Sequence, residues 1–207
     1  MLFPQSTGLL IQQNITHVLS LTNARNCPQI QAQTNISHLH VDIEDNPMED
    51  LLVCLDGLCA WIAHALGTGA GSSKKNNAKD EIANTESVSR KPKVLVHCIQ
   101  GISRSGSIIV AYLMRSLAIS YDDALRVARK YRPSIAPNSG FAEQLRVWER
   151  LECAVLSVKA TGGETEVIVK SEYEEWKGGR GILLSRVEAE KEKARMNAMR
   201  LLVQRCT

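Results

Sequence analysis

The stretch from residue 94 to residue 117 constrains the fold of this chain more than any other, because three local patterns follow one another there without a gap. Residues 94–96 are an apolar run, residues 97–105 read His-Cys-Ile-Gln-Gly-Ile-Ser-Arg-Ser, and residues 105–117 have the apolar spacing of a helix. A tight loop between a strand and a helix points successive backbone N–H groups into one concavity, which binds anions and phosphate above all. The stretch therefore predicts a phosphate-binding loop in an α/β fold.

Two side chains make this phosphate loop (residues 97–105) a candidate catalytic site. A thiol attacks phosphorus only as the thiolate, and a helix N-terminus or a nearby cation lowers the pKa of a cysteine. Cys98 is expected to have both, because Arg104 follows it in the loop. The planar guanidinium of Arg104 can also hold two phosphate oxygens through the transition state. The Ser105 hydroxyl can hydrogen-bond the Cys98 sulfur and ease its departure as a thiolate from a phosphocysteine.

The remaining residues of the loop are expected to bind phosphate mainly through the backbone. Gly101 lets the backbone approach an anion closely, and His97 can hold the loop in place through hydrogen bonds. The predicted phosphate-binding residues are Ile99, Gln100, Gly101, Ile102, Ser103 and Arg104. The other histidines show no metal-ligand spacing and are predicted to be ordinary structural residues: His17, His38, His40 and His64.

Hydrolysis of a phosphoester also requires an acid, because the ester oxygen otherwise leaves as an alkoxide or a phenoxide. Residues 37–43 alternate between polar and apolar, a pattern that predicts a half-buried strand. Three candidate carboxylates lie near the end of this stretch or just beyond it. Asp42 and Glu44 point the same way by that alternation, whereas Asp45 falls in the loop beyond it. We predict Asp45 as the acid, with Asp42 and Glu44 as alternatives. For Asp45 by itself, a turn or helix-capping role is the other interpretation.

Hydrophobic periodicity places further strands and helices around the loop. The predicted strands are residues 16–21, 37–43 and 93–97, and the predicted helices are residues 8–13, 46–67, 105–117, 120–132 and 138–155. Asn46 is expected to cap the second helix, with Glu49 completing a capping box; Ser120 and Asn138 are expected to cap the last two. This order predicts an α/β fold in which a small, mostly parallel central sheet is flanked by helices.

Composition bounds the domain count, the partners and the compartment. The 207 residues suffice for one domain with a tail, and 44% hydrophobic content provides a core. The net charge of +3 comes from Lys and Arg dispersed among 22 acids, which argues against a nucleic-acid partner. No segment has the apolar length of a membrane span, and no secretory signal is evident. The six cysteines show no disulfide or zinc pattern, so we expect reduced thiols, no metal, and a cytoplasmic or nuclear location.

Two regions differ in character from the predicted domain at residues 1–157. Residues 67–92 are small and polar without periodicity, and are expected to form a flexible surface insertion outside the core. Residues 158–207 form a C-terminal tail with a possible short strand at 166–169 and a charged helix at about 185–204, opened by a capping box at Ser185. The helix has a narrow apolar stripe that would dock on its own domain or on a partner: Val187, Ala194, Ala198, Leu201 and Leu202.

These motifs resemble the dual-specificity group of the cysteine-dependent protein tyrosine phosphatases. The resemblance runs from about Leu9 to Val155, interrupted by the insertion, and rests on the phosphate loop together with residues 15–19, 43–51, 111–114 and 137–145. The chain begins almost at the first helix, so the domain is short at its N-terminus for this family. The resemblance implies a protein tyrosine phosphatase-like fold without metal or cofactor.

The same resemblance implies roles for individual residues and a class of substrate. Cys98 would be the nucleophile, Arg104 the phosphate clamp, and Asp45 first the general acid and then the general base. Ser105 would assist departure of the thiolate, and Asn138 would help to hold the phosphate loop. The expected substrates are proteins that carry phosphotyrosine, phosphoserine or phosphothreonine.

Two alternatives to a protein phosphatase remain at this point, and the sequence does not indicate an oligomeric state. The first is a phosphatase for lipid, nucleotide or glucan phosphate. Relatives that act on lipid phosphates place lysines inside the loop, whereas this chain has Ile99, Gln100 and Ile102 there, which argues against phosphoinositides. The second is a non-catalytic module that binds phosphoproteins, although the chain retains the cysteine, the arginine and the acid that catalysis requires.

Overall fold

The computed structural model describes residues 7–30, 34–68, 91–161, 164–180 and 186–206. Most of the insertion predicted at residues 67–92 therefore lies outside the described residues. Within the described ranges, none of the helices is both long and apolar enough to span a lipid bilayer.

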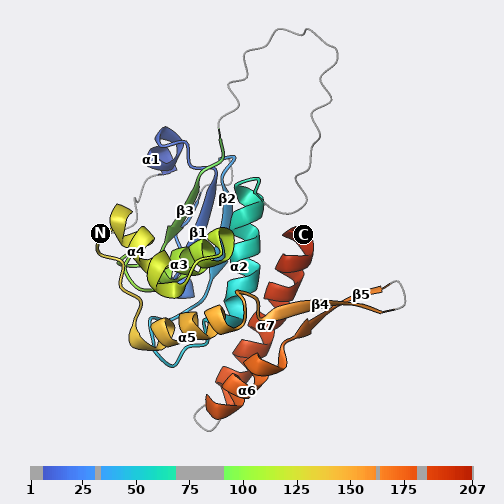
Figure 1. Ribbon diagram of the computed structural model, residues 1–207. Coiled ribbons are helices and arrows are strands. Elements are labelled where there is room, and N and C mark those ends of the chain that lie inside the picture. The colour runs from blue at the N-terminus through green and yellow to red at the C-terminus, as the bar shows by residue number, and fades with distance from the viewer. Residues whose placement is uncertain (1–6, 31–33, 69–90, 162–163, 181–185, 207) are drawn as a thin grey trace, which may run out of the picture.

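Three parallel strands form the sheet that positions the phosphate loop (Figure 1). They are β1 (His17–Leu21), β2 (Ser37–Val41) and β3 (Val94–His97), in the spatial order β2-β1-β3. Because all three run in the same direction, their carboxyl ends meet at one edge of the sheet, where ligands of open α/β sheets bind. Cys98 follows β3 directly and Asp42 follows β2, so the candidate residues start from the same edge.

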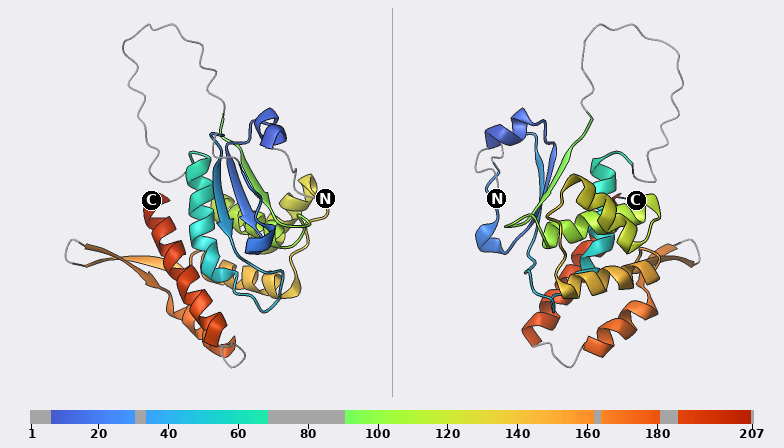
Figure 2. Two further views of the ribbon diagram at one scale, coloured as in Figure 1. Left: turned by 180° about the vertical axis from the view of Figure 1, so that it is seen from behind. Right: turned by 60° about the vertical axis from the view of Figure 1, so that its left-hand side comes forward.

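Four helices lie on one side of this sheet: α2 (Leu52–Ala65), α3 (Arg104–Leu117), α4 (Tyr121–Tyr131) and α5 (Ser139–Arg150). The short helix α1 (Thr7–Gln12) and the 3-10 helix η1 (Ala24–Asn26) lie on the other side (Figure 2). Leu19 and Leu21 of the central strand are fully buried in the main apolar core. The predicted parallel sheet with flanking helices is thus confirmed.

The predicted caps of two helices are present. The Ser120 hydroxyl accepts a hydrogen bond from the Asp123 N–H (3.2 Å) at the start of α4, and Asn138 Oδ1 accepts from the Phe141 N–H (2.9 Å) at the start of α5. α5 ends at Arg150, earlier than predicted. Residues 152 and 153 that follow have positive φ angles of 55° and 54°, a conformation that cannot continue a right-handed helix.

The predicted cap of α2 is wrong. Asn46 forms a turn instead: its side chain accepts a hydrogen bond from the Met48 N–H (2.9 Å), and its carbonyl accepts from the Glu49 N–H (2.9 Å). α2 begins only at Leu52, whose N–H donates to Gln144 Oε1 on α5 (3.2 Å). Asparagine suits a turn as well as a cap. Gln144 on a distant helix thus caps the Leu52 N–H, which no local pattern could reveal, while the local Asp50 Oδ1 accepts from the Val53 N–H (3.2 Å).

The C-terminal segment contains more structure than the sequence predicted. A hairpin is formed by β4 (Leu156–Thr161) and β5 (Glu164–Val169), which pair antiparallel and are separate from the main sheet. The helix α6 (Ser171–Arg180) follows, and then α7 (Arg186–Cys206), which corresponds to the predicted charged helix. The predicted short strand lies within β5, whereas β4 and α6 were not predicted. The proposed cap Ser185 lies outside the described residues.

The predicted apolar stripe of α7 is wrong, although the helix does dock on its own domain. Ala194, Ala198 and Leu201 are exposed, Leu202 is half-buried, and the side chain of Val187 lies outside the described residues. The buried positions are Glu192, Met196, Met199 and Val203, and the three apolar ones belong to the main core. Flexible methionines at helical spacing therefore contact the main core. Both alanines of the predicted stripe face water.

A glycine on α2 permits the close approach of α7. A Cβ added at Gly57 would lie 2.7 Å from the sulfur and 3.1 Å from the Cα of Met199, which is shorter than van der Waals contact. The backbones of the two helices thus approach closely at this point, and any larger residue there has to push α7 away.

We expect Gly57→Val to lower the free energy of unfolding by about 1–3 kcal/mol, because the added methyl groups overlap Met199. Gly178→Ala is the matched control, since a Cβ at Gly178 on α6 meets no atom within 4 Å. That control should be neutral or slightly stabilising. Urea unfolding followed by circular dichroism measures both, and equal stability of Gly57→Val and wild type would contradict the close contact.

Candidate active site

The sulfur of Cys98 lies at the centre of a ring of hydrogen-bond donors. Cys98 is buried at the end of β3, its Sγ is 3.3 Å from Ser105 Oγ, and it accepts a hydrogen bond from the Gly101 N–H (3.2 Å). The donors come from the phosphate loop and from the first turn of α3. Strand, loop and helix thus bring their polar groups to one atom, as the sequence predicted.

The pKa of the Cys98 thiol lies below its ordinary value. Burial by itself raises this pKa, but hydrogen bonds from the Ser105 hydroxyl and from the backbone N–H groups of Ser105, Gly101 and Ile102 together outweigh burial. Hydrogen bonds to the charged form of a group favour that form. The sequence predicted that the helix N-terminus and Arg104 lower the pKa of Cys98. In the structure, this pKa is lowered by amide and hydroxyl donors of the loop and of the helix N-terminus.

The phosphate loop is fixed from the side of α4 and the segment that follows it. Gly101 has a φ of 69°, in the left-handed region, and a Cβ there would lie 2.8 Å from the guanidinium of Arg132. Arg132 Nε donates to the Gly101 carbonyl (2.9 Å), and the Ala136 N–H donates to the Ile102 carbonyl (3.2 Å). Glycine is therefore favoured here by its backbone conformation, which L side chains rarely adopt. Ile99 and Gln100, at the tip, are exposed.

Arg104 is buried and only partly satisfied. Its Nη1 donates to the Ile43 carbonyl (3.2 Å), whereas its Nε has no hydrogen-bond partner among the residues that the structure describes. The nearest carboxylate oxygen, Asp45 Oδ2, is 3.9 Å from this Nε. A buried guanidinium nitrogen without an acceptor is unusual, and a phosphate oxygen would supply that acceptor.

Asp45 joins three segments that are distant in the sequence. Its Oδ1 accepts hydrogen bonds from the Ser103 hydroxyl (2.6 Å) and from Asn138 Nδ2 (2.8 Å), and the Asn138 N–H donates to Ser103 Oγ (3.1 Å). Ser103 precedes α3 but does not cap that helix with its side chain. The predicted acid, the predicted loop support Asn138 and the phosphate loop are therefore in direct contact.

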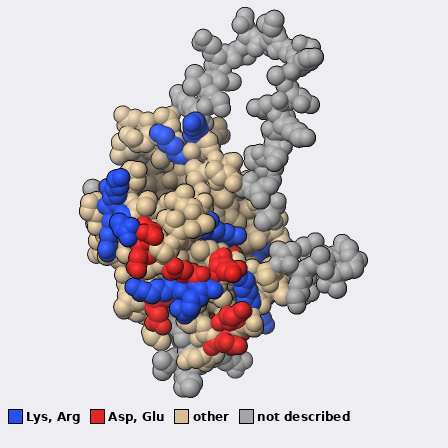
Figure 3. Space-filling model, viewed as in Figure 1, with Lys and Arg blue, Asp and Glu red and all other residues tan. Residues whose placement is uncertain are grey.

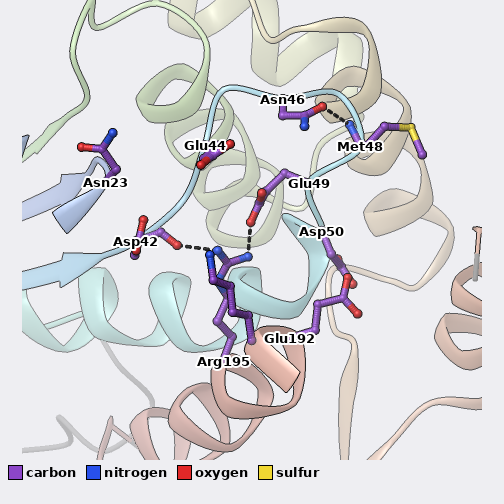
Figure 4. Close-up of a pocket in the computed structure, with 10 residues that line it drawn as sticks. Asn23, Asp42, Glu44, Asn46, Met48, Glu49, Asp50, Glu192 and Arg195 are labelled. Carbon is purple, nitrogen blue, oxygen red and sulfur yellow. Dashed lines mark hydrogen bonds and ion pairs between the residues drawn. The ribbon is translucent and has the colours of Figure 1, made fainter. Parts of the chain in front are cut away.

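The two alternative acids lie elsewhere. Asp42 and Glu44 line a pocket of about 490 Å³ between the acid loop (residues 42–51) and α7, and Cys98 is not among the residues that line it (Figure 4). Asp45 starts no helix, because α2 begins only at Leu52. Of the three carboxylates, Asp45 is the one that contacts the phosphate loop.

His97 supports the loop through a network that crosses the sheet. Its Nε2 is hydrogen-bonded to Ser20 Oγ on β1 (2.6 Å), and the same hydroxyl is hydrogen-bonded to His38 Nε2 on β2 (2.8 Å). Nδ1 of His97 lies 3.4 Å from the Cys98 carbonyl oxygen. The sequence did not predict that Ser20 and His38 would support His97, because this contact depends on the order and register of three strands.

Burial lowers the pKa of His97 to about 4, with a further lowering from His38 and His40 against a raising hydrogen bond to the Cys98 carbonyl. His97 is therefore neutral at cellular pH, and it acts on the loop as a hydrogen-bonding group rather than as a cation.

A comparison with protein families now places this chain. A family model described as the dual specificity phosphatase, catalytic domain, matches residues 4–151. Since this match covers more than half of the chain, the chain belongs to the dual specificity phosphatase family. The match ends before β4, so the hairpin, α6 and α7 lie outside it.

Individual relatives agree with this assignment. Dual specificity protein phosphatase 8 from Homo sapiens is 34% identical over 142 residues, which are 69% of this chain and 19% of that protein. The chain thus spans about a fifth of the length of this curated relative. The solved structure of a human tyrosine phosphatase-like serine/threonine/tyrosine-interacting protein has a TM-score of 0.57 and 27% identity, with coverage of 73% of this chain and 87% of that one. The Yvh1 phosphatase domain from Chaetomium thermophilum has a TM-score of 0.56 and 28% identity, covering 72% and 86%.

The stability of the fold should depend on pH through His97. The unfolded imidazole has its ordinary pKa of 6.5, so the unfolded chain takes up a proton before the folded one does. His97 therefore leaves the free energy of unfolding unchanged above pH 6.5 and lowers it as the pH falls from 6.5 toward 4. In His97→Asn this part of the decrease should be absent, as measured by urea unfolding across that range. An unchanged dependence in His97→Asn would contradict the prediction.

Proposed function

We propose that this protein is a phosphatase that hydrolyses phosphotyrosine, phosphoserine and phosphothreonine in proteins through a cysteinyl-phosphate intermediate. The observation that carries the proposal is the pairing of two features at one site. The Cys98 thiol has a lowered pKa, and the buried Arg104 close by in the same loop has a guanidinium nitrogen for which the described part of the chain offers no acceptor. Membership of the dual specificity phosphatase family supports the same activity.

In the first step, the Cys98 thiolate attacks phosphorus and the bond between phosphorus and the ester oxygen breaks. The departing oxygen takes the electron pair of that bond, and Asp45 supplies the proton that neutralises it. Arg104 and the backbone N–H groups of the loop bind the non-bridging oxygens, where negative charge develops. No metal is required, because the arginine and the amide groups provide the positive potential.

In the second step, water attacks the cysteinyl phosphate and inorganic phosphate leaves. Asp45, deprotonated by the first step, accepts a proton from the attacking water. The bond between sulfur and phosphorus breaks, and the electron pair returns to Cys98. The Ser105 hydroxyl, 3.3 Å from the sulfur, stabilises the thiolate as it leaves.

The alternatives are less well supported by the same observations. Similarity to a protein named as phosphatase-like and interacting favours a binding module, but this chain has the nucleophile Cys98 and the acid Asp45, which binding alone does not need. A phosphoinositide would need additional cations at the loop, yet positions 99, 100 and 102 are uncharged. Phosphate release from a panel of phosphopeptides, phosphoinositides, nucleotides and phosphorylated glucan separates these classes of substrate.

The proposed partner is a phosphoprotein substrate in the cytoplasm or the nucleus. The six cysteines are free, as a reducing compartment allows. Cationic and anionic side chains are interspersed on the face that Figure 3 shows, which does not favour a nucleic-acid partner.

Cys98→Ser should abolish release of phosphate from p-nitrophenyl phosphate while binding of a phosphotyrosine peptide persists, because the alcohol is not ionised but the loop is retained. Cys27→Ser removes a partly buried thiol outside the site and serves as the control. Vanadate should inhibit the wild type. Full turnover by Cys98→Ser would exclude Cys98 as the nucleophile, and no turnover by the folded wild type would favour a binding module.

Asp45→Asn should lower kcat for phenyl phosphate by about 100-fold or more, because phenoxide leaves slowly without a proton donor. Asp42→Asn and Glu44→Gln are the matched variants and should retain wild-type rates, since neither carboxylate contacts the phosphate loop. A large loss in either of these, with Asp45→Asn active, would assign the acid to that residue instead.

A further inference from the structure

One arginine of the C-terminal helix binds both ends of the acid loop. Arg195 on α7 donates from Nη1 to Glu49 Oε1 and from Nη2 to the carbonyl of Asp42 (2.6 Å), as Figure 4 shows. Asp45 lies between these two anchor points in the chain. Resting on the function proposed above, we propose that Arg195 is a positioning residue that fixes the acid loop so that Asp45 reaches the leaving oxygen.

The helix that carries Arg195 is itself rigidly placed. Met196, the next residue, is buried with Met199 and Val203 in the main core, and Gly57 allows α7 to approach α2 closely. A side chain that starts from a well-packed helix has less freedom to lose when it binds. The packing of α7 in the core therefore fixes the position of Arg195, and the hydrogen bonds of Arg195 fix the acid loop.

A second contact from the C-terminal segment reaches the same loop. Tyr173 on α6 is fully buried, and its hydroxyl donates to Asp50 Oδ2 (2.6 Å). Lys177 of α6 also forms an ion pair with Glu192 of α7 (3.1 Å). The two helices thus support each other, and both hold the end of the acid loop that leads into α2.

The geometry requires an arginine at position 195. The side chains of Arg195 and Glu49 are only 17% and 16% exposed, so their ion pair is poorly screened by water. A guanidinium can donate to a carboxylate and to a backbone carbonyl in different directions at once. Lysine keeps the charge, but its single ammonium group does not reproduce this planar fork.

Arg195 is expected to affect the acid and not the nucleophile. Its side chain donates hydrogen bonds to Glu49 and to the Asp42 carbonyl, both in the acid loop. The phosphate loop has its own supports, from Arg132 and from His97. Loss of Arg195 should therefore misplace Asp45 while Cys98, which follows β3 directly, remains in place.

The test compares two phosphate esters in the wild type and in Arg195→Gln. Phenyl phosphate requires protonation of its leaving group, whereas dinitrophenyl phosphate releases a stable anion without an acid. We expect kcat/KM for phenyl phosphate to decrease about 10-fold or more in Arg195→Gln, with kcat/KM for dinitrophenyl phosphate close to wild type, because kcat/KM reports the step in which the leaving group departs and excludes the later hydrolysis of the cysteinyl phosphate. Arg205→Gln removes the same charge from an exposed position on the same helix and should behave as wild type.

The ratio of the two kcat/KM values does not depend on the fraction of folded enzyme, so partial unfolding cannot imitate the expected result. Arg195→Lys should give an intermediate ratio, because it restores the charge but only one of the two contacts. If the wild type turns over both esters and Arg195→Gln leaves the ratio unchanged, the positioning role is wrong and the proposed function stands. If the wild type turns over neither ester, the proposed function is wrong and the role of Arg195 with it.

Discussion

The arrangement of the candidate site depends on the two hydrogen bonds that Asp45 Oδ1 accepts from Ser103 and Asn138. They connect the acid loop, the phosphate loop and the start of α5. Each donor has a second partner as well: Ser103 accepts from the Asn138 N–H, and Asn138 caps α5 through Phe141. Ser103 is buried, so loss of Asp45 takes this acceptor from its hydroxyl away from bulk water, which is more costly than the loss of a hydrogen bond at the surface.

Arg104 lies near the same carboxylate, and its guanidinium is only partly hydrogen-bonded. Folding buries this guanidinium, yet within the described ranges its Nε finds no hydrogen-bond acceptor and lies 3.9 Å from Asp45 Oδ2. A buried polar group without a partner raises the free energy of the folded chain. A phosphate oxygen that accepts a hydrogen bond from Nε removes this penalty. Relief of the unfavourable burial of Nε therefore contributes to the affinity for phosphate. The site thus favours an oxyanion over a neutral ligand.

Local patterns predicted the centre of the site, and distant contacts determined what the sequence analysis missed. Cys98, Ser105 and Arg104 could be placed together because a strand, a loop and a helix that are adjacent in the chain fix their geometry. The cap of α2 is supplied by Gln144, so the expected role of Asn46 was wrong. The contact of Ser20 with His38 and His97 requires the strand order, and the buried face of α7 is selected by Gly57 on α2.

The acid loop is held from two sides, and the proposed chemistry is compatible with this arrangement. On one side, Gly140 of α5 lies so close to Pro47 that a Cβ there would overlap the Pro47 carbonyl. On the other side, Arg195 and Tyr173 come from helices beyond the segment that the family model matches. Asp45 itself is 37% exposed. An acid that gives a proton to one oxygen and then takes one from water has to face two positions in turn, which a carboxylate on a loop with fixed ends can do.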